Sequence, residues 1–351
     1  MLAPITHILP LTTIRRRRLL PVPGRVLVRA GKNVNPTDIV AVATIAPEHK
    51  LINVARSLGV TADEADSMVL KQPGEEIAFG DVIASRSGIS GRVIRARSAG
   101  RVVAVGGGQV LLETESNPYE LKAGIPGSVT KLVPDRGVII ETRGALVQGV
   151  WGNNRVDYGT MHVLTRSLEG SLTPDQMDVS HRGSFILAGY LGDVDTLQIA
   201  ANLPIRGMIL SSMSPLLVPM AKQMDFPIVI IEGFGQIHLN EVAYKLLFSN
   251  DKREISVNAE TYNRFENVRP EIIIPLRTAG QQPEPREADI FAPGQQVRIV
   301  RAPHMASTGI LVSLSPGVTK FPNGIRTQAA EVQLEDNKIV IVPLANLDVL
   351  E

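Results

Sequence analysis

The chain has 351 residues, enough for about two to three domains, and 44% of them are hydrophobic, which is ample for buried cores. A formal net charge of +1 excludes a strong overall basic field, and the absence of cysteine excludes disulfides, thiol catalysis and cysteine-ligated zinc. No apolar run reaches the roughly 18 residues that a membrane-spanning helix needs. We therefore expect a cytoplasmic protein without a membrane partner.

The first feature along the chain is a run of arginines. Residues 1–23 are predicted to form a basic arm, because the four arginines are consecutive and no acidic residue precedes Asp38. Such a run is interpreted either as a solvated tail or as a contact with phosphate or with an acidic partner surface. The candidate contact residues are Arg15, Arg16, Arg17 and Arg18.

Residues 24–165 are predicted to form a β domain with a helical insertion. Short apolar stretches bounded by glycine, such as "GRVLVRAG" and "GRVVAVGGGQVLLETE", are typical of strands joined by tight turns. Between these stretches, the apolar spacing of residues 47–59 predicts a helix that ends at Gly59, and Thr61 is the expected N-cap of a second short helix.

Residues 174–276 are predicted to form an α/β domain. Near-continuous apolar strands alternate there with helical patterns, which indicates a parallel sheet covered by helices. Strands are expected at 183–190, 205–212, 226–233, 253–259 and 269–276, and helices at 193–203, 214–224 and 240–250.

The remaining part of the chain is predicted to be a linker and a small barrel. Residues 277–293 are rich in Pro, Glu and Gln, which is typical of a linker. Residues 294–351 contain about four or five short apolar stretches, enough strands for a small barrel. The predicted fold class is therefore multidomain, β-rich plus α/β.

One sequence pattern occurs twice. Residues 31–41 read "GKNVNPTDIVA" and residues 74–84 read "GEEIAFGDVIA", with Gly, an aliphatic residue, Asp and Ala at the same spacing. This repeat resembles the barrel-sandwich hybrid fold of biotinyl and lipoyl carrier domains, which is built from two like halves. Carrier domains need a lysine in an exposed hairpin between the halves, and the only lysine between residues 33 and 70 is Lys50, without the surrounding motif. We therefore expect a shape-giving turn and no cofactor.

The C-terminal segment resembles a KOW-type SH3-like barrel, as found in bacterial transcription elongation factors and ribosomal proteins. The residues that carry this resemblance are Gly294, Val297, Ile299, Pro303, Gly309 and Val312. Ala302 stands in place of the glycine usual before the proline, and Ala306–Ser307 replaces the inner glycine. The segment holds equal numbers of basic and acidic residues, so a protein-docking barrel fits better than a basic nucleic-acid module. No family is recognised for the whole chain.

The α/β domain offers the residues for a ligand site. Parallel sheets bind ligands beyond the carboxyl ends of their strands, where helix N-termini can also hold an anion. The ligand-binding candidates at these ends are Asp193, Ser211, Ser212, Ser214, Glu232, Gly233 and Gly235. The alternative is that the aspartate and serine are N-caps and that the glycines only form turns.

No nucleotide-binding, hydrolase or metalloprotease motif is present, so the sequence predicts no catalytic residue, metal or cofactor. We interpret the chain as a non-catalytic scaffold or adaptor that docks on a protein partner, such as a nucleoprotein complex of transcription or translation. One alternative is a small-ligand-binding protein or enzyme that uses the α/β cleft. The other is direct nucleic-acid binding through the arginine arm and the KOW-like barrel, expected to be weak because charge is balanced.

Overall fold

The computed structural model describes residues 2–44, 47–86, 91–114, 118–164, 170–263, 268–276, 284–286 and 288–351. Strands hold 48% of the chain and helices 14%, so the protein is β-rich, with several sheets. The chain divides into unit 1 (Met1–Leu19, Val26–Val40 and Lys122–Glu351) and unit 2 (Leu20–Arg25 and Ala41–Leu121). In these described ranges, no helix is long and apolar enough to cross a membrane.

The arginine run lies inside a strand of unit 1. β2 (Ile8–Leu19) pairs antiparallel along most of β14 (Gly137–Gln148), with Arg15 opposite Glu141. The β-branched residues that precede the arginines are buried, Ile14 completely. Such residues favour a half-buried strand, and their burial outweighs the solvation of the neighbouring charges. The expectation of a separate arm is therefore wrong for residues 8–19.

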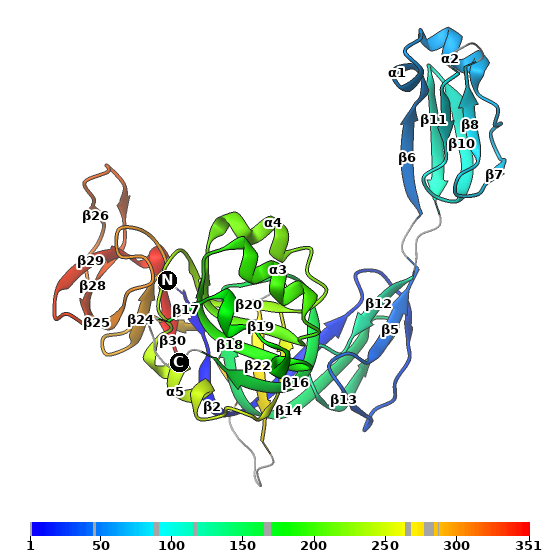
Figure 1. Ribbon diagram of the computed structural model, residues 1–351. Coiled ribbons are helices and arrows are strands. Elements are labelled where there is room, and N and C mark those ends of the chain that lie inside the picture. Colours follow the sequence, from blue (N-terminus) through cyan, green and yellow to red (C-terminus); the bar gives the residue numbers. More distant parts are fainter. Residues whose placement is uncertain are drawn as a thin grey trace. The chain divides into compact units, whose positions relative to one another are not determined.

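A twelve-stranded sheet forms the centre of unit 1 (Figure 1). Its order is β15-β20-β19-β18-β16-β21-β22-β14-β13-β4, with β17 beside β18 and β2 beside β14. The further strands are β4 (Asn33–Val34), β13 (Gly127–Val133), β15 (Trp151–Gly152), β16 (Val156–Val163), β17 (Ser171–Leu172), β18 (Ser184–Leu191), β19 (Gly207–Met213), β20 (Ile228–Phe234), β21 (Glu254–Asn258) and β22 (Glu271–Pro275).

Helices cover both faces of the parallel part of this sheet. β16, β17 and β19 each pair parallel with β18, and β20 pairs parallel with β19. Alternate residues of each strand face opposite sides. Ile186 and Leu210 therefore share a core with α3 (Val194–Asn202) and α4 (Val218–Ala221), whereas Leu187 and Ile209 share one with α5 (Glu241–Phe248).

Two details of this region differ from expectation. The helix expected at 214–224 is only a 3₁₀ turn (Pro215–Leu217) followed by the single turn α4, because Pro219 has no amide hydrogen to continue a helix. β21 is not part of the parallel set. A tight turn after α5, with Lys252 at φ 63°, reverses the chain so that β21 pairs antiparallel with β16.

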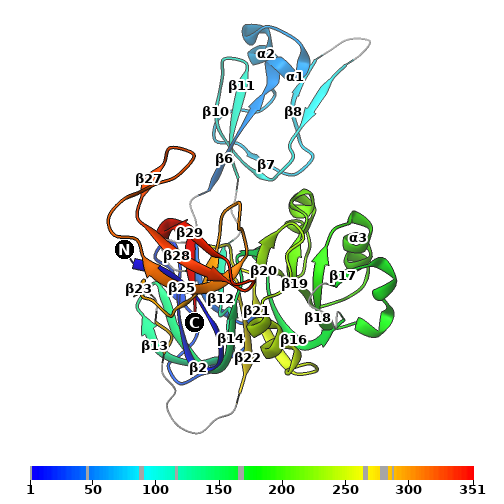
Figure 2. The same ribbon diagram turned by 90° about the vertical axis from the view of Figure 1, so that its left-hand side faces the viewer.

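A second sheet of unit 1 joins the two ends of the chain (Figure 2). Its order is β23-β1-β30-β24-β25-β28-β29. The strands are β1 (Leu2–Thr6), β23 (Ala288–Ile290), β24 (Gln296–Ile299), β25 (Thr308–Leu314), β28 (Ala329–Leu334), β29 (Ile339–Pro343) and β30 (Leu347–Leu350). β1 pairs parallel with β30, so the N-terminal residues complete the C-terminal sheet. Of the predicted linker, residues 277–283 and 287 lie outside the described part.

Unit 2 contains a four-stranded sheet in the order β6-β11-β10-β7 and a hairpin of β8 and β9. Its elements are β6 (Glu48–Asn53), α1 (Val54–Leu58), α2 (Ala62–Met68), β7 (Glu76–Ile77), β8 (Val82–Ser85), β9 (Val93–Arg95), β10 (Gly100–Gly106) and β11 (Gln109–Thr114). The helix expected at 47–59 is wrong in its first half, because residues 48–53 pair along β11. Gly59 (φ 68°) and Thr61 are helix caps as predicted.

The repeated pattern forms the same turn at each position. Gly31 and Gly74 adopt φ 81° and 88°, and their amides donate to Val129 O and Val102 O. The aspartates also match, since Asp38 accepts from the amide of Asn35 (2.9 Å) and Asp81 from that of Ala78 (3.0 Å). Gly294, at φ 90°, makes the same bond to Leu311 O. The turn therefore occurs three times, and its role is to reverse the chain.

Candidate functional site

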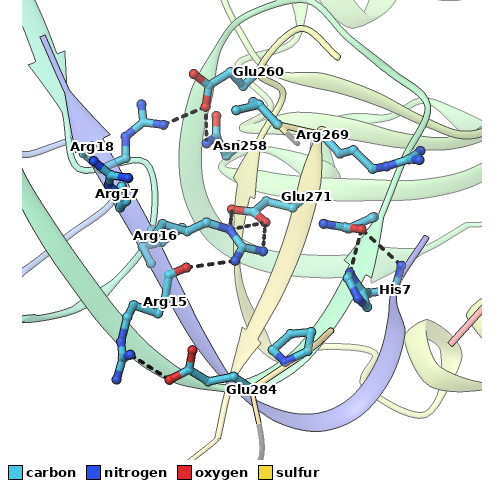
Figure 3. Close-up of a pocket in the computed structure, with 14 residues that line it drawn as sticks. His7, Arg15, Arg16, Arg17, Arg18, Asn258, Glu260, Arg269, Glu271 and Glu284 are labelled. Atoms are coloured by element: carbon cyan, nitrogen blue, oxygen red, sulfur yellow. Dashed lines mark hydrogen bonds and ion pairs between the residues drawn. The ribbon is translucent and has the colours of Figure 1, made fainter. Parts of the chain in front are cut away.

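The arginine run borders a partly open cavity of about 190 Å³ in unit 1 (Figure 3). β2 supplies the arginines, and the opposing wall comes from Asn258, Glu260, Val268, Arg269, Glu271, Glu284 and Pro285. The charged and titratable lining residues are His7, Arg15, Arg16, Arg17, Arg18, Glu260, Arg269, Glu271 and Glu284.

Three of the four arginines are ion-paired. Arg16 forms a fork with Glu271, with Nε–Oε2 and Nη2–Oε2 distances of 3.0 and 2.7 Å, and the Glu271 side chain is only 4% exposed. Arg18 Nη1 lies 2.6 Å from Glu260 Oε2, and Arg15 contacts Glu141 and Glu284. A phosphate group would have to displace these carboxylates, because bidentate guanidinium–carboxylate pairs occupy the same donors.

His7 closes one end of the cavity. Its amide and its Nδ1 both lie against Gln148 Oε1, at 3.1 and 3.0 Å, and its Nε2 is 2.9 Å from the carbonyl oxygen of Arg286. Burial lowers the pKa of His7 below 6.5, although these acceptors and Glu351 oppose the shift. The imidazole connects Gln148 on β14 with the carbonyl group of Arg286.

Two of the strand-end candidates lie opposite each other on neighbouring parallel strands, and a third begins a helix. Ser212 on β19 is opposite Gly233 on β20. The Ser212 hydroxyl donates to Ile237 O (2.9 Å) and accepts from the Ile237 amide (3.1 Å). Asp193 accepts from the Thr196 amide at 2.7 Å and is the N-cap of α3. These polar groups therefore hold the loops and helix starts in place.

Glu232 belongs to a buried ionic network. One carboxylate oxygen accepts from the Asn240 amide and side chain, at 2.9 and 2.6 Å, which fixes the start of α5. The other lies 3.1 Å from Arg298 Nη1, and the two side chains are only 1% and 2% exposed. Arg298 also contacts Asp348 at 3.7 Å, and Asp348 lies 3.6 Å from Arg269. Glu232 thus joins β20 to the C-terminal sheet.

Arg298 is the central residue that sequence reasoning missed. In the sequence it is one of the five basic residues of the C-terminal segment, and no motif marks it as buried. The available signal was its position in "VRIV", where a single charge lies between two apolar residues, Val297 and Ile299, that are 0% and 2% exposed. A charged residue in such a strand requires a buried partner. Glu232 supplies it from a distant part of the sequence.

The outer face of the C-terminal sheet carries exposed aliphatic side chains. We use the name outer face for Ile310, Val312, Ile339 and Ile341, which are 43%, 39%, 59% and 53% exposed. β28 lies between the two contributing strands, and Gln333 is in register with both Ile310 and Ile339. The four residues therefore flank one strand of one sheet.

β29 is also the edge strand on this side of the sheet. Leu334 N donates to Lys338 O, so the hydrogen-bonded pairs of the β28–β29 hairpin fall at every second residue from there. Ile339 and Ile341 occupy the intervening positions, which direct their backbone N–H and C=O groups away from β28. Among the described strands, β28 is the only one that pairs with β29. The edge beside the outer face is therefore open to an added strand.

No protein-family model matches this chain, and no curated protein matches it.

Proposed function

We propose that the protein is a non-catalytic, multidomain scaffold or adaptor that docks a protein partner on the outer face and open edge of its C-terminal sheet. The observation that carries this proposal is the combination of four exposed aliphatic side chains with the outward-facing backbone groups of Ile339 and Ile341. An extended segment with alternating aliphatic residues satisfies both features, because its backbone pairs with β29 and its side chains cover the outer face.

The polar groups elsewhere in unit 1 support a scaffold over an enzyme or ligand sensor. Ser212, Asp193 and Glu232 each make hydrogen bonds within the fold. Catalytic groups need a partner atom on the substrate, so groups engaged in this way favour a structural role. Nucleic-acid binding through Arg15–Arg18 is likewise disfavoured, because Arg15, Arg16 and Arg18 are ion-paired.

The module identities belong to the same proposal. We assign the repeated-turn region to a barrel-sandwich hybrid, residues 174–276 to an α/β domain and residues 294–351 to a KOW-type SH3-like barrel. The first assignment depends on the matching glycine turns, of which Gly31 lies in unit 1 and Gly74 in unit 2, and the parallel strands β18, β19 and β20 support the second. A cytoplasmic partner within the transcription or translation machinery fits these modules.

The proposal is tested with the full chain purified from native cells together with its bound partner. The Ile339 and Ile341 amides should exchange hydrogen more slowly in the complex than in the chain alone. Replacing Ile310, Ile339 and Ile341 together by Thr should abolish both the protection and the co-purification. Leu216→Ser, which alters a side chain 86% exposed outside the outer face, should preserve both.

Two results would contradict the docking site. One is a partner that stays bound to the triple Thr variant. The other is concentration-dependent protection of the same amides in the purified chain alone, which would assign the edge to self-association.

A further inference from the structure

A second group of arginines lies in unit 2, spread along the sequence and not in a run. Between Val82 and Leu112 the chain contains five arginines and no acidic residue. They are Arg86, Arg92, Arg95, Arg97 and Arg101. This stretch covers β8, β9 and β10, so the arginines are held on a folded hairpin and the strand that follows it.

An exposed aromatic ring lies beside two of these arginines. Phe79 is 77% exposed, although phenylalanine is usually buried. Its neighbour Gly80 accepts a hydrogen bond from Arg95 Nη1 at 2.9 Å and donates its amide to Ala96 O at 2.9 Å. Continuing the β8–β9 register beyond Val82 and Arg95 places Gly80 opposite Arg97. Phe79, Arg95 and Arg97 therefore form one continuous surface.

The turn that presents Phe79 is rigid. Gly80 adopts φ 89°, the Asp81 amide donates to Ala78 O, and the Asp81 carboxylate accepts from the Ala78 amide at 3.0 Å. Ile77, two residues before Phe79, is buried in the core of unit 2. A ring held in this way loses little conformational entropy when it binds a ligand.

These arginines differ in their partners from those of the N-terminal run. Arg101 lies 3.5 Å from Glu113, and Arg86 donates to Leu58 O at the end of α1. In the part of the chain that the structure describes, Arg92, Arg95 and Arg97 are exposed and form no ion pair with a carboxylate. Their positive charge is therefore available to a ligand, whereas that of Arg15, Arg16 and Arg18 is already neutralised.

We infer that Phe79, Arg95 and Arg97 form a binding face for single-stranded nucleic acid, with Arg92 supplying a further positive charge from the same hairpin. An exposed aromatic ring stacks with an unpaired base of any sequence, and flanking guanidinium groups contact the phosphates on either side. A duplex would not use the ring, because its bases are already stacked. An acidic peptide would use the arginines but gain little from Phe79. The exposed ring of Phe79 therefore favours single-stranded nucleic acid over a duplex or an acidic peptide.

The test uses fluorescently labelled 12-mers of oligo-dT and oligo-U with the full chain, measured by anisotropy over a range of salt concentrations. Phe79→Ala should weaken binding by about 5- to 150-fold, the range for loss of one stacked base. Phe79→Leu should also weaken it, because leucine keeps the apolar area but lacks the aromatic face. Changing Arg92, Arg95 and Arg97 to Gln should flatten the log–log salt slope by about 2.

A matched control removes the same charge from the C-terminal segment. Arg301, Lys320 and Arg326 are exposed, and changing all three to Gln should leave oligonucleotide binding unchanged. Loss of binding in this control would assign the contact to the C-terminal barrel and overturn the inference. Failure of the full chain to bind either oligonucleotide would also overturn the inference. So would unlabelled poly-Glu that displaces the oligonucleotide as well as unlabelled oligonucleotide does, together with unchanged binding in Phe79→Ala.

Discussion

Replacing Arg298 by Met tests the buried ionic network that joins β20 to the C-terminal sheet. The substitution keeps most of the side-chain volume but removes the charge that lies 3.1 Å from Glu232 and 3.7 Å from Asp348. Removing one partner of a buried ion pair leaves the other charge uncompensated, because water cannot reach it.

The expected loss of unfolding free energy depends on the contacts that Glu232 and Asp348 keep in the variant. Loss of one partner of such a pair costs about 3–5 kcal/mol of unfolding free energy. Glu232 retains two bonds from Asn240, and Asp348 retains Arg269 at 3.6 Å. The loss for Arg298→Met should therefore lie at the lower end, about 3 kcal/mol.

Unit 1 has a built-in reporter for this measurement. Trp151 is the only tryptophan, and it lies on β15 against Phe234, with the ring centroids 6.0 Å apart. Its fluorescence in urea therefore follows unfolding of unit 1 alone. Arg206→Met serves as the control, because the Arg206–Asp157 pair is half-exposed and should contribute at most about 1 kcal/mol.

A double-mutant cycle separates the pair from its surroundings. Arg298→Met combined with Glu232→Gln should cost at least about 1 kcal/mol less than the sum of the single changes, because the second change removes a charge that the first has stranded. A loss in Arg298→Met no larger than in Arg206→Met, or strict additivity in the cycle, would refute the reasoning.

The other predictions concern pH, the repeated turn and domain connectivity. Because the pKa of His7 is lowered in the folded chain, the unfolded chain binds that proton more readily, and the unfolding free energy of unit 1 should fall as pH drops below about 6.5; a His7→Gln variant that keeps the full slope in urea titrations would contradict this. Gly74→Ala should lower the unfolding free energy of unit 2 by about 1–2 kcal/mol, because alanine is strained at a φ of 88°. The added Cβ meets no atom within 4 Å, so backbone strain is the whole effect, and unchanged hydrogen exchange in unit 2 would contradict it. Limited proteolysis should cut first within 277–293, and earlier cleavage inside 183–258 would contradict that assignment.

Much of the secondary structure could be predicted from residues that are close together in the sequence. Asp193, Thr61 and Gly59 are caps as predicted, because a cap depends on residues within one turn of the helix. The strands at 184–191, 207–213 and 228–234 follow from apolar runs too short for helices.

The features that sequence did not predict depend on partners far along the chain. Residues 48–53 have a helical apolar spacing, yet pairing along β11 determines their conformation. Arg15–Arg18 look like a free basic run, yet three of them meet carboxylates between residues 141 and 284. A run of basic residues in the sequence therefore does not show how many of those charges are free to bind a ligand. The exposure of Phe79 and of the outer face likewise becomes apparent only once the strands are paired.

Site-specific photo-crosslinking in native cells tests the scaffold proposal most directly. A photoreactive residue at Ile341 lies on the open edge of β29, and one at Leu216, on the 3₁₀ turn Pro215–Leu217, lies outside the outer face. The proposal predicts a discrete protein adduct from position 341 that position 216 does not give. Absence of any adduct at 341, or the same adduct from both positions, would contradict docking at the C-terminal sheet.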